Sequence, residues 1–206
     1  MFIKSNRRLT RRVSFNLIWL LVLLAATAPA ALADELAIWN FNDSDLTVDH
    51  GGGTLVTNLN AANILFASGT TTNARLGDAA GQSLSLQGGS STANNGRQIT
   101  FNVSTLGFSN IIVSFATQGT STGFNSNQFQ YSLDGTTFVN FAAPYTPASA
   151  FGSVPLVFSL AAIAELADNP NAAFRIVFNG ATSSTGTNRI DNFVVEGTPL
   201  TTSVPE

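Results

Sequence analysis

Residues 99–141 carry the feature that most constrains the fold, which is a regular alternation of apolar and polar side chains. The apolar positions form three groups: Ile99, Phe101 and Val103; Ile111, Val113 and Phe115; and Phe129, Tyr131 and Leu133. A period of two is typical of a β-strand with one face in a core and the other in water. We therefore expect an antiparallel β meander at the centre of the domain.

A turn signal follows the third of these runs. Asp134 and Gly135 separate two segments of strand-like sequence, and Asp-Gly is a strong hairpin signal. The pair predicts a type I′ turn, which needs positive φ at both central residues.

Six further short segments have the composition of strands and are bounded by Gly, Pro, Asn and Ser. They are residues 37–41, 63–67, 83–87, 154–160, 172–178 and 189–195. Residues 160–167 form the one helical-looking piece, which ends at Asp168-Asn169-Pro170. Because regular helices do not separate the strands, the pattern predicts an all-β fold: an antiparallel β-sandwich, jelly-roll-like, with one short helix.

The N-terminal residues 1–33 have the three parts of a secretory signal peptide: a basic start, an apolar run and a small-residue end. We expect cleavage between Ala33 and Asp34. A membrane anchor is the alternative, but the apolar run from Phe15 to Ala26 is shorter than the ~20 residues that span a bilayer. The expected domains are then the signal peptide, a β-sandwich at 34–197 and a linker at 198–206.

The charges beyond residue 33 exclude one class of partner. That part holds four arginines and all 12 acidic residues, so its balance is 4 − 12 = −8. Four scattered arginines cannot form the basic stripe that phosphate neutralisation requires, so no nucleic-acid partner is expected. The chain has no cysteine, which removes thiol nucleophiles and cysteine-ligated zinc.

Hydrolytic chemistry has few candidate residues. His50 is the only histidine, no Gly-x-Ser-x-Gly motif exists, and we expect no enzymatic activity. Paired carboxylates could in principle cleave glycosides, and Asp43, Asp45 and Asp49 are the candidates. They occupy one loop, where a solvated or cation-binding role is favoured, so a glycan-acting hydrolase is a distant alternative.

Asp191 is the most informative charged residue. In the run RIDNFVV it shares a strand face with Phe193 and Val195, so it is expected to point inward and to be ion-paired, hydrogen-bonded or metal-bound. One interpretation is an ion pair with Arg175 or Arg189. The other is a structural Ca²⁺ held by Asn42, Asp43 and Asp191, because oxygen ligands without Cys or a usable His suit calcium.

Aromatic residues offer a limited basis for sugar binding. Trp39 and Tyr131 lie in alternating strands and are expected in the core. Tyr145, in a loop flanked by Pro144 and Pro147, is the expected ligand-binding residue.

Three stretches together resemble a known family. They are LAIWNFN, the central FNVSTLGFSNIIVSFATQGT with NQFQYSLDGTTF, and the closing NPNAAFRIVFNGATSSTGTNRIDNFVVEGTP. This combination resembles the exported domain of PEP-CTERM sorting-domain proteins. Val204, Pro205 and Glu206 are similar to the start of the sorting signal, whose second proline, apolar helix and arginine cluster are missing here.

That resemblance implies a non-catalytic β-sandwich at the surface or in the extracellular matrix of a Gram-negative bacterium. It implies sorting by an exosortase only if the full signal exists. A weaker likeness joins FQYSLDGTTFVNF and RIDNFVV to discoidin-type and carbohydrate-binding jelly rolls, some of which hold a structural calcium. It implies, as the alternative function, a carbohydrate-binding or adhesion module with extracellular polysaccharide as partner.

Overall fold

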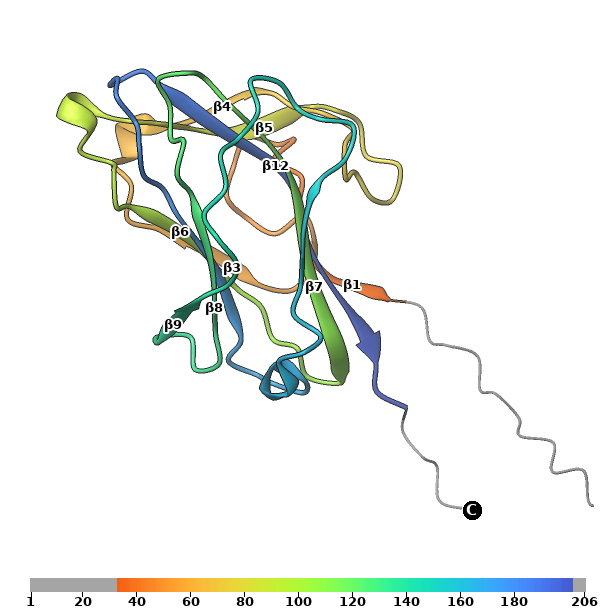
Figure 1. The fold of residues 1–206 in the computed structure, drawn as a ribbon. Helices are drawn as coiled ribbons and strands as arrows, with labels where there is room; N and C mark the ends of the chain where they lie inside the picture. The colour runs from red at the N-terminus through yellow and green to blue at the C-terminus, as the bar shows by residue number, and fades with distance from the viewer. Residues whose placement is uncertain (1–32, 202–206) are drawn as a thin grey trace, which may run out of the picture. The chain divides into compact units, whose positions relative to one another are not determined.

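A computed structural model describes residues 33–201, in which twelve strands form two antiparallel sheets (Figure 1). The seven-stranded sheet contains β1 (Asp34–Trp39), β2 (His50–Gly51), β4 (Ile64–Ser68), β5 (Gln82–Gln87), β7 (Phe108–Gly119), β10 (Leu156–Ser159) and β12 (Thr187–Pro199). The five-stranded sheet contains β3 (Thr54–Thr57), β6 (Gln98–Asn102), β8 (Gln128–Ser132), β9 (Phe138–Asn140) and β11 (Ala173–Val177). The predicted antiparallel β-sandwich is confirmed.

The prediction of a central β meander at residues 99–141 is wrong. The five-stranded sheet has the order β3-β6-β11-β8-β9, so β11 separates β6 from β8, and β7 belongs to the other sheet. From β5 to β12 the chain passes back and forth between the sheets, and β8 and β9 are the only consecutive strands of this stretch that pair. Alternation places a strand face toward the core, but it carries no information about which strands are neighbours.

The long strand β12 organises the seven-stranded sheet. Along one edge it pairs with β7. Along the other edge it pairs first with β5, from Thr187 to Ile190, and then with β1, from Phe193 to Gly197. The first and last strands are therefore adjacent, as the calcium hypothesis requires.

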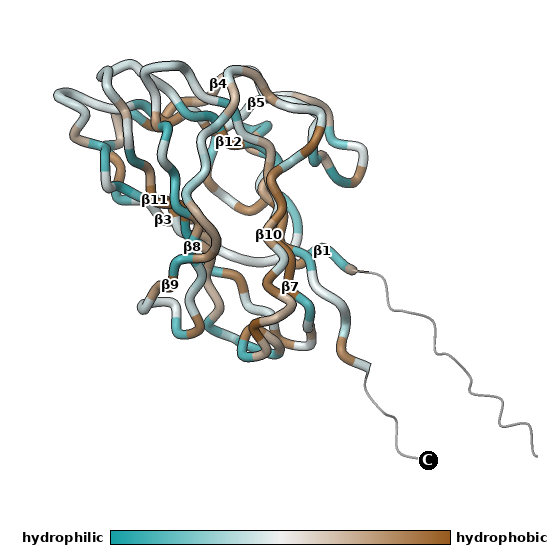
Figure 2. Tube along the Cα trace, in the orientation of Figure 1, coloured by the Kyte–Doolittle hydropathy of each residue, from teal (hydrophilic) through white to brown (hydrophobic). Residues whose placement is uncertain are grey.

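The space between the sheets is filled largely by aromatic rings. Phe193 lies at their centre: its ring stacks on Phe101 of the other sheet at a centroid distance of 3.5 Å, and Phe115 and Trp39 lie 5.5 and 6.1 Å away. All four side chains are buried. The tube around β7 and β10, on one side of this core, is mainly hydrophobic (Figure 2).

The expected inward faces are largely correct. All three residues of each of the first two groups, from Ile99 to Phe115, are buried, and so is Phe129. Tyr131 is half-buried against the core and Leu133 is exposed. The expected short helix is a single 3₁₀ turn at Ala164–Leu166, one of three such turns between residues 33 and 201.

The described residues near the two ends of the chain bear on the membrane-anchor alternative, the expected cleavage point and the expected linker. No helix among the described residues is long and apolar enough to cross a membrane. β1 begins at Asp34, the residue after the expected cleavage point, and β12 ends at Pro199, two residues into the expected linker. Ala31, Leu32 and the sorting-signal residues Val204, Pro205 and Glu206 lie outside the described residues.

The hairpin at Asp134-Gly135 is present, but its turn differs from the predicted type. Ser132 pairs with Phe138, so the loop contains five residues, and Gly135 is its one residue with positive φ, at +73°. The Asp134 carboxylate accepts hydrogen bonds from the backbone N–H groups of Thr136 and Thr137. This side-chain capping stabilises a longer loop, which explains why the two-residue turn is not formed.

Replacing Gly135 by valine should lower the free energy of unfolding by about 1–2 kcal/mol, the usual cost of left-handed backbone for a residue with a Cβ. A Cβ here would lie 3.5 Å from the Asn171 carbonyl oxygen, so the loss comes from φ and not from a clash. Gly152→Val is the matched control, because its Cβ also has its nearest contact at 3.5 Å and its φ is not positive. Urea unfolding of both variants makes the comparison, and equal losses would refute the backbone explanation.

Candidate functional sites: a junction at Asp191 and the outer face of the five-stranded sheet

A bulge in β12 determines where Asp191 points. Asp191 pairs with Ala116 but Val194 pairs with Ser114, so β12 holds one extra residue there, and Asn192 has a φ of +49°. Ile190 and Phe193 therefore both face the core. Asp191 does not share the face of Phe193 as expected, because the bulge breaks the alternation.

Asp191 is nevertheless fully buried. Its Oδ2 accepts a hydrogen bond of 2.7 Å from Thr70 N, and its Oδ1 accepts one of 2.9 Å from Asn192 N. The predicted ion pair is wrong: no basic group in the described part of the chain lies within 4 Å of this carboxylate. Arg175 belongs to the other sheet, and Arg189 Nη1 donates to the Ser68 carbonyl.

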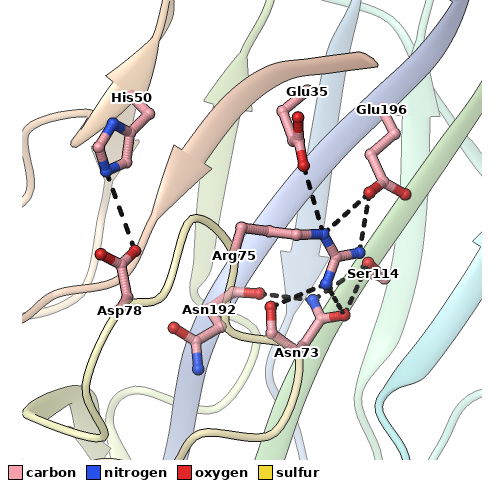
Figure 3. Close-up of polar contacts among 8 residues, drawn as sticks. All are labelled: Glu35, His50, Asn73, Arg75, Asp78, Ser114, Asn192 and Glu196. Atoms are coloured by element: carbon pink, nitrogen blue, oxygen red, sulfur yellow. Dashed lines mark hydrogen bonds and ion pairs between the residues drawn. The ribbon is translucent and has the colours of Figure 1, made fainter. Parts of the chain in front are cut away.

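The loop at residues 69–81 contacts this carboxylate through Thr70. Contacts of Asn73 with Asn192 and of Arg75 with Glu196 hold the loop on β12 (Figure 3). Asn192 Nδ2 donates to the carbonyls of Thr70 and Thr72, and Asn73 Nδ2 donates to the Asn192 carbonyl at 2.7 Å. Arg75 forms a 2.8 Å ion pair with Glu196 farther along the strand. These contacts fix the loop against β12, with the Thr70 N–H on Asp191 and the carbonyls of Thr70 and Thr72 on Asn192.

Oxygen atoms from three chain segments meet where the partner of β12 changes from β5 to β1. A Cβ on Gly69 would overlap the Asp191 Oδ2 and the carbonyl oxygens of Ala80 and Gln82, so these three oxygens all pack against the Gly69 Cα. Asn42 Oδ1, just beyond β1, accepts a hydrogen bond of 2.9 Å from Gln82 N. We call Asn42, Gly69, Ala80, Gln82 and Asp191 the junction cluster.

The other predicted carboxylates do not join the cluster. Asp43 is exposed, and its Oδ1 accepts a hydrogen bond from Asp45 N in the same loop. Asp45 is exposed and accepts from Thr47, while Asp49 Oδ2 accepts from Asn40 N at 2.7 Å. No group of three or more acidic or histidine side chains in the described residues could hold a metal ion. A cation at the junction would therefore depend on amide and carbonyl oxygens beside Asp191.

In metal-free buffer, the stability of the folded domain should fall as pH rises from about 4 to about 7. Burial raises the pKa of Asp191 to about 7, whereas an unfolded Asp titrates near 3.9. In this window the folded state binds more protons than the unfolded state, so stability is lost as pH rises, by up to about 1.4 kcal/mol per pH unit. Burial also raises the pKa of Asp49, which adds a loss of the same sign.

Urea unfolding between pH 4 and 8 measures this slope. Asp191→Asn should flatten it, and Asp43→Asn, which changes an exposed carboxylate by the same chemistry, should not. An unchanged slope in Asp191→Asn would assign the titration to another group.

Tyr145, the predicted ligand-binding residue, does not present an exposed ring. Its backbone pairs with Asn127, and its ring packs against Phe115 and Phe158. Its hydroxyl oxygen is buried, and burial raises the pKa of the phenol far above its usual value. The bridge to Asn127 turns the side chain inward, which the flanking prolines did not indicate.

The outer face of the five-stranded sheet is the second candidate site, and it carries planar amide groups. Residues that point away from the core follow one register across all five strands: Val56, Thr100, Arg175, Gln130 and Asn140. Gln98, Asn102 and Gln128 lie on the same face in the adjacent registers. We call this surface the amide face.

Hydrogen bonds hold part of the amide face in one arrangement. Arg175 Nε donates to Gln130 Oε1 at 2.6 Å, and Gln130 Nε2 donates to Asn140 Oδ1 at 2.6 Å. The Arg175 guanidinium carbon lies 3.7 Å from the centre of the Phe138 ring, a cation–π contact. Partial burial lowers the pKa of Arg175, which remains charged at every physiological pH.

One end of the amide face adjoins a depression of about 220 Å³. Asn102, which belongs to the face, and Asp134 of the β8–β9 loop line it, together with Asn171. Hydrogen bonds from the backbone amides of Thr137 and Thr136 hold the pKa of Asp134 well below its usual range. This end of the face is therefore polar and anionic, whereas its middle is cationic.

Sequence reasoning did not identify the amide face. The signal was present in NQFQYS and QITFN, where every outward position of an alternating strand is an amide or a hydroxyl. Arg175 was considered only as a partner for Asp191. The two-sheet pairing that places these positions on one surface cannot be read from the alternation.

Neither a family model nor a curated protein matches the chain. Several solved structures are similar to it. TmCBM61, solved with β-1,4-galactotriose, has a TM-score of 0.47 and 11% identity over 76% of this chain and 92% of that chain. The tandem CBM22-1–CBM22-2 domain of Paenibacillus barcinonensis Xyn10C has a TM-score of 0.49 and 11% identity, covering 87% and 49%. Domain 4 of AbnA, an extracellular arabinanase from Geobacillus stearothermophilus solved with arabinotriose, has a TM-score of 0.46 and 14% identity, covering 82% and 95%.

Proposed function

We propose that this domain is a non-catalytic polysaccharide-binding module, exported to the bacterial surface or extracellular matrix, and that the amide face binds the glycan. The observation that carries the proposal is the row of guanidinium and amide groups of Arg175, Gln130 and Asn140 on one sheet face. Each sugar hydroxyl is both a donor and an acceptor of hydrogen bonds. Gln and Asn side chains offer both functions in one plane and therefore match it.

The order already present on this face favours binding. The bonds between Arg175, Gln130 and Asn140 fix these side chains before a ligand arrives, which lowers the entropic cost of association. A rigid strand scaffold also spaces the groups regularly, and a repeating polymer can contact several of them at once. Export by the general secretory route, and exosortase sorting if the full C-terminal signal exists, belong to the same proposal.

Binding of the exported protein to a panel of plant and bacterial polysaccharides, measured by affinity electrophoresis, tests the proposal. Gln130→Ala should weaken the retained interaction by about tenfold, the cost of one or two hydrogen bonds. Gln118→Ala on β7 is the matched control, because it makes the same change on the other sheet. Equal effects of the two substitutions, or no retention by any polysaccharide, would reject the amide face as the binding site.

We also propose a structural Ca²⁺ at the junction cluster. The Asp191 carboxylate, the carbonyls of Ala80 and Gln82 and the Asn42 amide are all hard oxygen donors, the kind that calcium prefers. Two observations support the choice of ligands: Asp191 is buried, and Asn42 Oδ1 binds the amide of Gln82 in the same cluster, whereas Asp43 is exposed and bonds within its own loop. With one carboxylate in the set, the affinity should lie in the weak range of extracellular calcium modules, with Kd near 10⁻⁴ M or above.

A further inference from the structure

Arg175 is the one charged residue in the five strands of the five-stranded sheet. Those strands contain no Asp, Glu or Lys, and the sequence AFRIV of β11 supplies the single cation. The residue stands in the middle strand of the sheet, with β6 on one side and β8 on the other. A lone charge at the centre of a neutral polar face needs a specific reason, because long charged side chains are usually placed where water can solvate them.

The Arg175 guanidinium is positioned but not neutralised. Its Nε is taken by Gln130, and Phe138 covers one side of the planar group. Among residues 33–201 no carboxylate lies within 4 Å of it, and its two terminal nitrogens, Nη1 and Nη2, have no hydrogen-bond acceptor. The four N–H donors of Nη1 and Nη2, two of them on the terminal edge of the planar group, therefore remain available to a ligand.

We propose that Arg175 binds the carboxylate of a uronic acid, so that the polymer bound on the amide face is an acidic polysaccharide. The inference rests on the proposed glycan-binding function and names its substrate class. The terminal edge of a guanidinium presents two parallel N–H groups, which match the two oxygens of a planar carboxylate. Gln130 and Asn140 lie beside it in register and can bind the hydroxyl groups of the same or the next sugar.

The net charge of the domain opposes a polyanion only at long range. None of the acidic residues lies in the five strands, and at 0.15 M ionic strength charges are screened beyond about 8 Å. A uronate carboxylate on this face would therefore interact mainly with the Arg175 guanidinium and little with the distant acidic residues. At the depression, where Asp134 lies, a neutral sugar is favoured over a second uronate.

The test uses matched polymers and matched variants of the exported protein. The probes are polygalacturonate and alginate, the same polymers after reduction of their carboxyl groups to alcohols, dextran sulfate, and the neutral polymers galactan and xylan. The variants are Arg175→Gln, Arg175→Lys and, as the charge-matched control, Arg97→Gln, whose exposed side chain lies outside the strands. Titration calorimetry at 0.15 M NaCl gives each affinity, and melting curves verify that each variant is folded.

The expected result is binding of at least one uronate polymer by the parent and by Arg97→Gln, with at least about tenfold weaker binding by Arg175→Gln. Reduction of the carboxyl groups should weaken binding by the parent by the same factor and should not weaken binding by Arg175→Gln any further. Arg175→Lys, which keeps the charge but not the fork, should fall between the two.

Three results would overturn the inference: equal affinity of the parent and Arg175→Gln, equal affinity for native and carboxyl-reduced polymer, or binding to dextran sulfate alone. Binding of galactan or xylan that depends on Gln130 but not on Arg175 would leave the proposed glycan-binding function intact while rejecting the uronate. Binding to none of these polymers would reject the proposed function itself.

Discussion

Replacing Phe193 by alanine is expected to lower the free energy of unfolding by about 3–5 kcal/mol, a large part of the stability of a typical domain. Its ring is fully buried and touches Phe101 across the sandwich and Trp39 and Phe115 within its own sheet. Removing it would leave a cavity between two strand-borne layers, whose backbone hydrogen bonds limit collapse into the space. Urea unfolding followed by tryptophan fluorescence measures the loss.

Phe138→Ala is the matched control for this substitution. Phe138 is half-buried on the outer face, where its ring contacts Arg175 and does not join the core. The same deletion there should cost about 1 kcal/mol, because little apolar area is lost and water fills the space. Similar losses in the two variants would contradict the assignment of Phe193 as the centre of the core.

The sequence was sufficient to predict the strands because their alternation has one physical cause, a sandwich with one inner and one outer face. Phe101, Phe115 and Phe129 each lie inward as the period of two requires. The pattern could not identify strand partners, since any inward face satisfies the same rule. For that reason β11, far along the chain, was not expected between β6 and β8.

The site residues were harder to predict because each depends on a local irregularity. One inserted residue at Asn192 moves Asp191 from the expected core face to the opposite face, and no composition signal marks it. The contacts that cover Asp191 come from Thr70, 121 residues earlier in the chain. The prediction that Tyr145 is an exposed ligand-binding residue failed for a similar reason. A single backbone bridge to Asn127 directs its ring into the core.

The junction cluster also shows why a buried carboxylate is tolerated at this position. Between the end of β1 and the start of β5, β12 has no strand partner on one edge. Asp191 and Asn192 bind the backbone of the loop at residues 69–81 instead, so polar side chains replace the missing strand contacts. Two backbone amide bonds only partly offset the loss of hydration, as the raised pKa of Asp191 indicates. A cation would supply the remaining compensation.

Calcium at 10 mM is therefore expected to stabilise the folded protein by about 2.7 kcal/mol if Kd is about 0.1 mM. The reason is that a ligand that binds only the folded state contributes RT ln(1 + [Ca]/Kd), and here the calcium concentration is a hundredfold above Kd. For a domain of this size the melting temperature should rise by about 5–10 °C relative to EDTA. The comparison is made at pH 8, where the carboxylate is ionised before the metal binds.

Two isosteric variants decide between a site at the junction and a general effect of calcium on an acidic protein. Asp191→Asn should abolish the calcium-dependent shift, because it removes the one carboxylate of the cluster and leaves its carbonyls in place. Asp43→Asn removes the same charge from an exposed position near the end of β1 and should keep the shift. A shift lost in Asp43→Asn but kept in Asp191→Asn would mean that the acidic loop binds the ion. A parent melting temperature equal in calcium and EDTA, with no metal found by elemental analysis, would make Asp191 a hydrogen-bonded anchor for the loop and nothing more.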